Sequence, residues 1–179
     1  IRSNFAVAMK DLLQKVLDDI LADVPKEKID ERISIFKRNM HNLSYEVMAN
    51  PIGVKGIGKY ISKDSESAFS GYKKGTPVHV KSAINYNSLI DYWYEGKKYG
   101  KITNGNKIKW VYLKENEFGF DTIAYKGYED PPQVLEMIRN YIDHKKMFEQ
   151  AMSKKIGMFY KALKWGGVED KTTSIDRFF

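Results

Sequence analysis

The sequence predicts an α+β fold that is mainly helical, has a small β portion and ends in a flexible tail. Three observations favour it: apolar residues recur at helical spacing towards both ends of the chain, short central segments alternate as strands do, and glycines and prolines separate these patterns. Because 42% of the 179 residues are hydrophobic, the chain can bury a core. We place one domain at residues 1–167 and the tail at residues 168–179.

Two amphipathic helices are expected at the N-terminal end of the chain. Residues 4–24 carry apolar side chains at steps of three and four, Ser3 or Asn4 can cap the first turn, and Pro25 interrupts the pattern. A similar stripe predicts a second helix over residues 26–42. The short link between them predicts an antiparallel hairpin whose apolar stripes pack in the core.

Shorter elements are expected in the centre of the chain. Residues 45–49 and 77–81 alternate and predict strands, whereas residues 83–93 have the apolar spacing of a short helix. Residues 107–113 and 122–125 predict a pair of strands joined by a turn-like segment.

The C-terminal third is expected to be helical again. Asp130 as a cap, followed by Pro131-Pro132 in the first turn, is typical of a helix start. The apolar pattern runs to residue 142 and resumes over residues 147–163, and Gly166-Gly167 ends it.

Composition excludes several classes of chemistry. The absence of cysteine removes disulfides, thiolate zinc sites and cysteine nucleophiles. No long apolar run and no secretory signal pattern occur, so we expect a cytoplasmic protein without a membrane partner. The histidines His41, His79 and His144 do not have the spacing of metal ligands, and no carboxylate cluster suits a metal. We therefore expect no cofactor in this chain.

The positive charge is concentrated in three segments. The formal net charge is +7, whereas residues 1–46 sum to zero. Residues 51–86 hold six lysines and two acids, residues 97–114 six lysines and no acid, and residues 144–165 six lysines and one acid. If these segments fold onto one face, that face suits a polyanion.

The first basic segment has the residue types that bind a phosphate backbone. Glycines separate its lysines, and tyrosines such as Tyr60 lie among them. Lysines neutralise phosphates, and backbone N–H groups and tyrosine hydroxyls donate hydrogen bonds to them. We therefore predict a surface that follows DNA; the alternative is a solvated, flexible loop with surplus positive charge.

A nucleotide-binding loop is a second alternative for the same residues. Residues 53–60 read GVKGIGKY, which approaches the pattern G-x-x-x-x-G-K-[ST], but Tyr60 stands where Ser or Thr would hold Mg²⁺. A phenol does not fit that place, and no apolar strand ending in Asp supplies the second metal-side motif. The same glycines and lysines can equally hold a nucleic-acid phosphate.

The last eight residues, TTSIDRFF, place an aliphatic residue and an aromatic pair at the end of the chain. One helical turn puts Ile175 and Phe178 on the same face, with Phe179 beside them, as a plug for a hydrophobic pocket. The alternative is that this tail folds back on its own domain.

These residues are similar to a known family. The tail resembles the sliding-clamp-binding peptide of replicative DNA polymerases, with Thr172 in place of the usual glutamine. The rest of the chain resembles the C-terminal thumb of family B DNA polymerases from T-even-type bacteriophages. The matching blocks, in the family's order, are residues 36–45 (FKRNMHNLSY), 57–60 (IGKY), 77–81 (PVHVK) with Asn85-Tyr86, 113–124 (LKENEFGFDTIA) and 141–144 (YIDH).

The resemblance implies a thumb domain that grips primer–template duplex DNA just behind the polymerase active site. It assigns clamp binding to Thr172, Ile175, Phe178 and Phe179. It assigns DNA contacts to Lys59, Tyr60, His79, Lys81, Asn85 and Tyr86, and charge alone adds Lys55, Lys73 and Lys74.

The resemblance also implies partners for the chain. The catalytic aspartates belong to the palm of such a polymerase, so we expect Mg²⁺ only there and no polymerisation by this chain alone. The expected partners are the primer–template duplex, the sliding clamp, and the palm and fingers of the polymerase, at the replication fork of an infected bacterium. An autonomous DNA-binding replication accessory protein remains the milder alternative.

Overall fold

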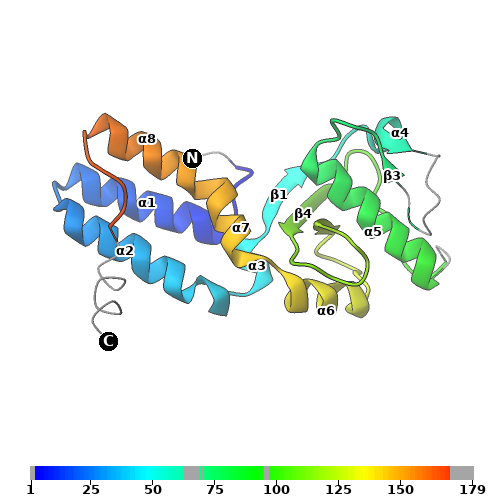
Figure 1. Cartoon of the computed structure of the whole chain (residues 1–179). Helices are drawn as coiled ribbons and strands as arrows, with labels where there is room; N and C mark the ends of the chain where they lie inside the picture. Colours follow the sequence, from blue (N-terminus) through cyan, green and yellow to red (C-terminus); the bar gives the residue numbers. More distant parts are fainter. Residues whose placement is uncertain (1–2, 63–68, 70, 95–96, 170–179) are drawn as a thin grey trace. The chain divides into compact units, whose positions relative to one another are not determined.

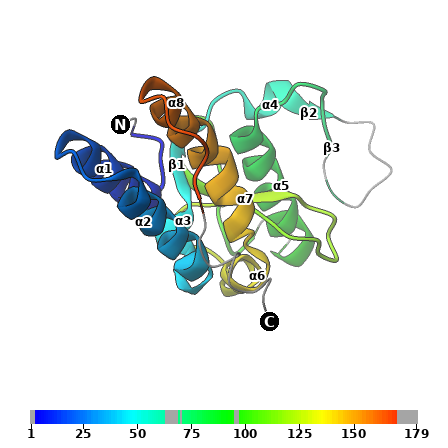
Figure 2. The ribbon, with the colours of Figure 1, turned by 60° about the vertical axis from the view of Figure 1, so that its left-hand side comes forward.

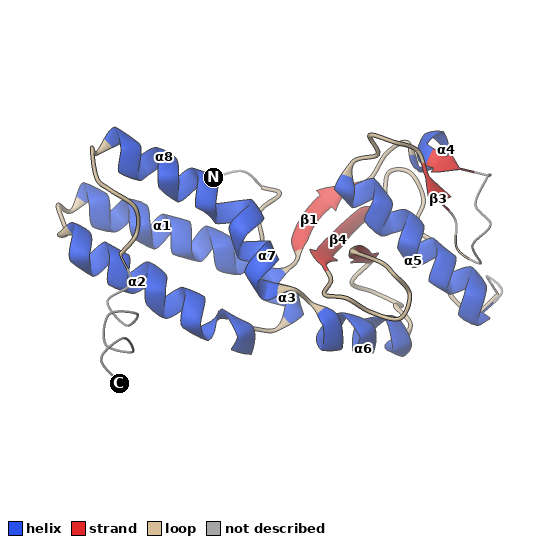
Figure 3. Cartoon of the chain, in the orientation of Figure 1, coloured by secondary structure: helices blue, strands red, loops and turns tan. Residues whose placement is uncertain are grey.

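The computed structural model describes residues 3–62, 69, 71–94 and 97–169, and it confirms an α+β fold with small sheets (Figures 1 and 3). Its contacts divide the chain into two compact units. Unit 1 comprises Phe5–Met48 and the segment from His144 onward, and unit 2 comprises Ala49–Asp143 with Ser3 and Asn4. The sequence patterns, which predict one domain over residues 1–167, do not indicate this division.

Unit 1 is built on the predicted helical hairpin. Helix α1 spans Val7–Leu21 and α2 spans Lys26–Asn39, and Figure 2 shows the two lying side by side. Their apolar stripes meet in the core, where Met9, Val16 and Ile29 are at most 1% exposed. The hairpin prediction is therefore confirmed, with both helices a few residues shorter than expected.

The strand predicted over residues 45–49 is wrong. The 3₁₀ helix η1 spans Met40–Asn42, and a single helical turn, α3, spans Tyr45–Met48. Tyr45 and Met48 are both buried, at a spacing of three that one helical turn produces. A window of five residues is too short to separate this spacing from strand alternation.

The C-terminal helical run contains a wider turn. Helix α7 spans His144–Phe148, a π-helical segment η2 spans Glu149–Ser153, and α8 spans Lys154–Ala162. Phe148, Met152, Ile156 and Tyr160 are all buried, at steps of four. Because an α-helix has about 3.6 residues per turn, side chains spaced by four residues gradually rotate around a straight helix. The wider π-helical turn compensates for this rotation and keeps these four side chains on the core side.

A buried carboxylate joins α2 to α8. Asp30 is 3% exposed, accepts a hydrogen bond from the Tyr160 hydroxyl at 2.6 Å and pairs with Lys26 Nζ at 2.6 Å. Lys26 Nζ also donates to the backbone oxygen of Gly167 at 3.0 Å, and Trp165 packs edge-on against the Tyr160 ring. Each polar group of this network has a hydrogen-bonding partner, and the network links the segment after α8 to α2.

Unit 2 contains a three-stranded antiparallel sheet in the order β1-β4-β5. Its strands are β1 (Asn50–Gly53), β4 (Lys107–Tyr112) and β5 (Thr122–Tyr125), so the predicted pair over 107–113 and 122–125 is confirmed. Pro51 lies in β1, the edge strand, opposite Lys109. Proline is tolerated there because an edge strand leaves one row of N–H groups unpaired.

Helix α5 spans Val78–Tyr94 and packs along β5. The strand predicted over residues 77–81 is wrong, because the amides of Val80 and Lys81 both donate to the Pro77 oxygen at 3.0 Å and begin the helix. Before α5, the one-turn helix α4 (Ile57–Tyr60) leads into a two-stranded sheet of β2 (Ile61–Ser62) and β3 (Gly71–Tyr72).

Helix α6 spans Pro132–Tyr141 and begins as predicted at the proline pair, but Asp130 is not its cap. The Asp130 carboxylate instead accepts hydrogen bonds from the backbone amides of Lys126 and Gly127, at 2.8 and 2.7 Å, and from the Tyr86 hydroxyl at 3.0 Å. Asp130 therefore closes the turn after β5 and holds it against α5.

Candidate nucleic-acid interface

Backbone hydrogen bonds bring two basic segments of unit 2 together. Gly53 lies opposite Lys107 in the β1–β4 pair, and beyond it the Val54 amide donates to the Asn106 oxygen at 3.0 Å. The Ile57 amide then donates to Asn104 Oδ1 at 3.0 Å. Lys55 therefore lies on a loop fixed beside the turn that precedes Lys107.

A second set of bonds adds the segment around β3. The Lys73 amide donates to the Tyr60 oxygen at 2.9 Å, which extends the β2–β3 ladder by one pair. The chain then turns through Gly75, whose φ of +81° favours glycine, and Thr76 Oγ1 donates to the Lys73 oxygen at 2.5 Å. This turn leads directly into α5, and Figure 2 shows α4, β2 and β3 at the end where α5 begins.

Five exposed lysines project from these segments, and we call them the lysine cluster. Among the residues that the structure describes, none of the five has an ion-pair partner; the Lys59 ammonium lies 5.4 Å from the Tyr60 ring centre. Unpaired exposed ammonium groups keep their full charge available for an anion. The members of the cluster are Lys55, Lys59, Lys73, Lys74 and Lys107.

Lys81 and Tyr60 border the lysine cluster. Lys81 is half-buried, and its ammonium lies 5.3 Å from the centre of the Tyr72 ring. Tyr60 is also half-buried and lies in the one-turn helix next to Lys59. Nine residues were predicted to bind DNA. Six of them lie in neighbouring segments of unit 2, namely Lys81, Tyr60 and all members of the lysine cluster except Lys107.

His79 lies in the first turn of α5 and is half-buried. Burial lowers the pKa of its imidazole below the usual 6.5, so the ring is largely neutral at pH 7. A neutral imidazole can donate one hydrogen bond to a phosphate but does not neutralise its charge. His79 therefore fits the interface less well than the sequence prediction implies.

Asn85 and Tyr86 do not fit a DNA contact, and this part of the prediction is corrected. Asn85 is 1% exposed and donates from Nδ2 to the Thr122 oxygen at 2.9 Å. Tyr86 is fully buried, its hydroxyl donates to Asp130, and burial followed by this carboxylate raises its pKa. Both side chains hold α5 against β5 and the turn that follows it.

The structure does not favour a nucleotide-binding loop over residues 53–60. Such a loop opens a longer helix whose first amides point at the phosphates. Here α4 is four residues long, and the Ile57 amide is already bound to Asn104. The left-handed φ of +76° at Gly56 serves only to turn the chain from β1 into this short helix.

Sequence reasoning missed Lys107 as a member of the lysine cluster. Lys107 belongs to the second basic segment, and only the β1–β4 register places it opposite Gly53. Predicting that pairing in advance would have required recognising β1 as a strand despite Pro51. The third basic segment, residues 144–165, belongs to unit 1.

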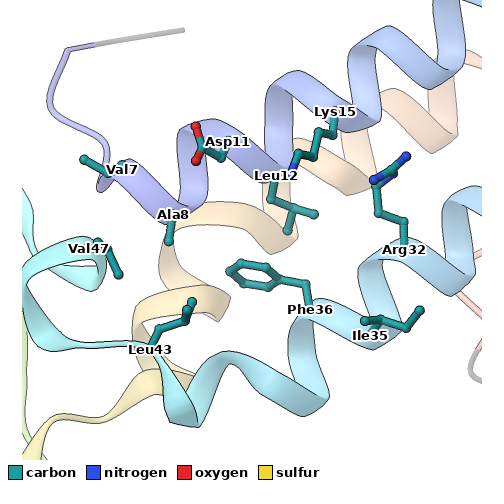
Figure 4. Close-up of a pocket in the computed structure, with 10 residues that line it drawn as sticks. All are labelled: Val7, Ala8, Asp11, Leu12, Lys15, Arg32, Ile35, Phe36, Leu43 and Val47. Atoms are coloured by element: carbon teal, nitrogen blue, oxygen red, sulfur yellow. The ribbon is translucent and has the colours of Figure 1, made fainter.

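Unit 1 has an open apolar pocket between α1 and α2, with a volume of about 370 Å³. Figure 4 shows Leu12 and Phe36 directed into it, with Asp11, Lys15 and Arg32 also on its lining. Arg32 already pairs with Asp19, through Nε at 2.6 Å. The lining contains no histidine, serine or threonine.

Three further findings bear on partners. Over the described ranges, no group of three or more histidines and acids is placed to hold a metal ion. No helix in this part of the chain has the length and apolarity needed to cross a membrane. The predicted clamp-binding residues Thr172, Ile175, Phe178 and Phe179 lie outside the described residues.

Comparison with known proteins does not assign the chain to a family. No protein-family model matches the chain, and no curated protein sequence is significantly similar to it. A function must therefore be inferred from the residue blocks quoted above and from the geometry of the lysine cluster.

Proposed function

We propose that unit 2 holds duplex DNA through its phosphates, as part of the C-terminal thumb of a replicative family B DNA polymerase. The observation that supports this most directly is the lysine cluster, five exposed lysines on segments that are hydrogen-bonded to one another. Exposed positive charge that has no ion-pair partner within the described ranges suits a polyanion.

The chemistry of this contact is independent of DNA sequence. Each ammonium that pairs with a phosphate releases a condensed counterion, so affinity depends steeply on salt. The flanking Tyr60 hydroxyl and His79 can fix the position of the backbone through neutral hydrogen bonds without reading bases. A polymerase thumb requires this kind of grip, because it must hold every sequence that it copies.

A titration of the whole chain against labelled primer–template duplex tests this function. Fluorescence anisotropy over a series of salt concentrations should show binding that weakens steeply with salt and does not vary with base sequence. A slope that corresponds to roughly three or more phosphate contacts, at about 0.9 per contact, is the expected result. Absence of duplex binding at low salt would contradict the proposal.

The second part of the proposal concerns the tail. We propose that Thr172, Ile175, Phe178 and Phe179 bind a sliding clamp and so raise the effective concentration of the polymerase on DNA. The aspartates that bind Mg²⁺ and perform nucleotidyl transfer would lie in the palm, so the chain alone contributes grip and tethering and no catalysis.

Replacing both Phe178 and Phe179 by alanine should abolish or severely weaken clamp binding, by at least about tenfold, because buried aromatic anchors dominate such interfaces. Calorimetric titration with the sliding clamp of the same replication system measures the change. Duplex affinity of the same variant should stay as in the unmodified chain, since the lysine cluster is untouched. Equal clamp affinity of the two proteins would remove the tail from the proposal.

A further inference from the structure

The far end of α5 presents tyrosine rings beside lysines, away from the lysine cluster. Tyr94, in the last turn of α5, packs against Tyr99, with ring centres 4.7 Å apart and planes at 64°. The Tyr94 hydroxyl donates to Gln133 Oε1 at 2.6 Å, which fixes this ring against the start of α6. Lys98 is exposed, and its ammonium lies 5.4 Å from the centre of the Tyr99 ring.

The turn after β5 supplies a second ring and a second lysine. Tyr128 is 56% exposed, and the Lys126 ammonium lies 5.0 Å from its ring centre. The backbone here is tightly held, because Asp130 accepts from the amides of Lys126 and Gly127. Gly127 and Glu129 both have left-handed φ values, +88° and +50°, so the turn is a defined conformation that carries Tyr128 on its outside.

These two elements form one surface. A Cβ atom added to Gly100 would lie 3.5 Å from Lys126 Nζ, so the segment after Tyr99 touches the turn that carries Tyr128. We call the surface the tyrosine–lysine patch; it comprises Tyr94, Tyr99, Tyr128, Lys98 and Lys126.

The patch combines the two components of a site for unpaired nucleotides. Aromatic rings stack on bases of any sequence, and neighbouring lysines pair with the phosphates between those bases. Bases in a duplex are already stacked on each other, so accessible ring faces, such as those of exposed Tyr128 and half-buried Tyr99, favour a strand whose bases are free. Lys98 is exposed and Lys126 is half-buried, so both can reach the phosphates of such a strand.

We propose that the tyrosine–lysine patch binds single-stranded nucleic acid, with bases stacked on Tyr99 and Tyr128 and phosphates paired with Lys98 and Lys126. This site is distinct from the lysine cluster, since Lys81 and Tyr94 are separated along α5 by about 20 Å. Glu129, next to Tyr128 in the sequence, is exposed, and its negative charge disfavours a phosphate close to it. The inference does not require that the chain belong to a polymerase.

The test is the affinity of the full chain for a labelled oligothymidylate of about 16 nucleotides, a length within the range that one such site covers. Replacing both Tyr99 and Tyr128 by alanine should weaken this binding about tenfold or more, because each base loses its stacking partner. Tyr92→Ala is the matched control: Tyr92 is 57% exposed on α5 but packs against Phe69 instead of the patch. Circular dichroism confirms that the variants are folded.

Two further ligands make the result decisive. A strand of the same length without bases keeps its phosphates, so it should bind the unmodified chain more weakly and show no difference between the chain and the double variant. The double variant should bind duplex DNA with the same affinity as the unmodified chain, whether that affinity is high or low. This comparison tests the patch independently of the proposed thumb function. Unchanged oligothymidylate affinity in the double variant, an equal loss in Tyr92→Ala, or equal binding of the baseless strand would each overturn the inference.

Discussion

Replacing Lys55, Lys59, Lys73 and Lys74 by glutamine is expected to weaken duplex binding by about 100-fold at roughly 0.1 M salt. Each lost phosphate contact removes about 0.9 from the slope of the logarithm of affinity against that of salt, so the loss of four contacts should flatten the slope by about 3.6. Anisotropy over the salt series measures both quantities. Glutamine keeps the polar side chain and removes only the charge, so the fold of unit 2 is expected to persist.

The control for this variant removes the same charge elsewhere. Lys15, Lys28, Lys37 and Arg38 are exposed basic residues of unit 1, in the part of the chain whose charges sum to zero. Changing them to glutamine lowers the net charge by the same four units, and the salt slope should then stay close to that of the unmodified chain. If both variants lose the same affinity, the effect comes from total charge and the lysine cluster is not the binding surface.

Asp30→Ala is expected to destabilise unit 1 by about 2 kcal/mol, since it leaves the buried Tyr160 hydroxyl without its acceptor and removes one of the two acceptors of the Lys26 ammonium. Hydrogen exchange read by mass spectrometry should show lost protection in α2 and α8. The matched control is Glu31→Ala, the next residue of α2, whose side chain is exposed. A loss below about 0.5 kcal/mol, the usual range for surface changes, would contradict the role given to Asp30.

The same network predicts a sensitivity to alkali. The hydrogen bond with Asp30 raises the pKa of Lys26, and burial followed by the Asp30 hydrogen bond raises the pKa of Tyr160. Charged Lys26 and neutral Tyr160 are therefore the forms that the fold favours. Both groups have a higher pKa in the folded chain than in the unfolded chain, where it is about 10. Their contribution to the free energy of unfolding is therefore fully present below about pH 10 and is lost as the pH rises further. The stability difference between the unmodified chain and Asp30→Ala should accordingly narrow above about pH 10.

The sequence predicted the long helices well and the short elements poorly. Residues 4–24 and 26–42 repeat their apolar pattern over several turns, and tertiary packing agrees with it in α1 and α2. Residues 45–49 and 77–81 offer about one period each, which fits a strand and a helical turn equally. The prediction that Asp130 caps α6 is wrong. A carboxylate before two prolines is typical of a helix cap, but the partners of Asp130, Tyr86 and the turn amides, are set by the tertiary fold.

The candidate site was predictable where it depended on local charge. Lys55, Lys59, Lys73 and Lys74 are exposed, as solvated lysines flanked by glycines usually are. Asn85 and Tyr86 came from the family resemblance, and their polar groups gave no sign that α5 buries most of its circumference. The tyrosine–lysine patch could not be predicted, because only the tertiary fold brings Lys126, in the turn that Asp130 closes, close to Gly100.

The discontinuous unit 1 has a consequence for synthesis on the ribosome. Apart from Ser3 and Asn4, unit 2 is one continuous stretch and can complete its fold once Asp143 has emerged. The hairpin of α1 and α2 is synthesised before α8, which lines a pocket with Ile33 and supplies the Tyr160 partner of Asp30. During that interval part of the apolar stripe of the hairpin remains exposed, so the nascent hairpin is expected to benefit from chaperone protection.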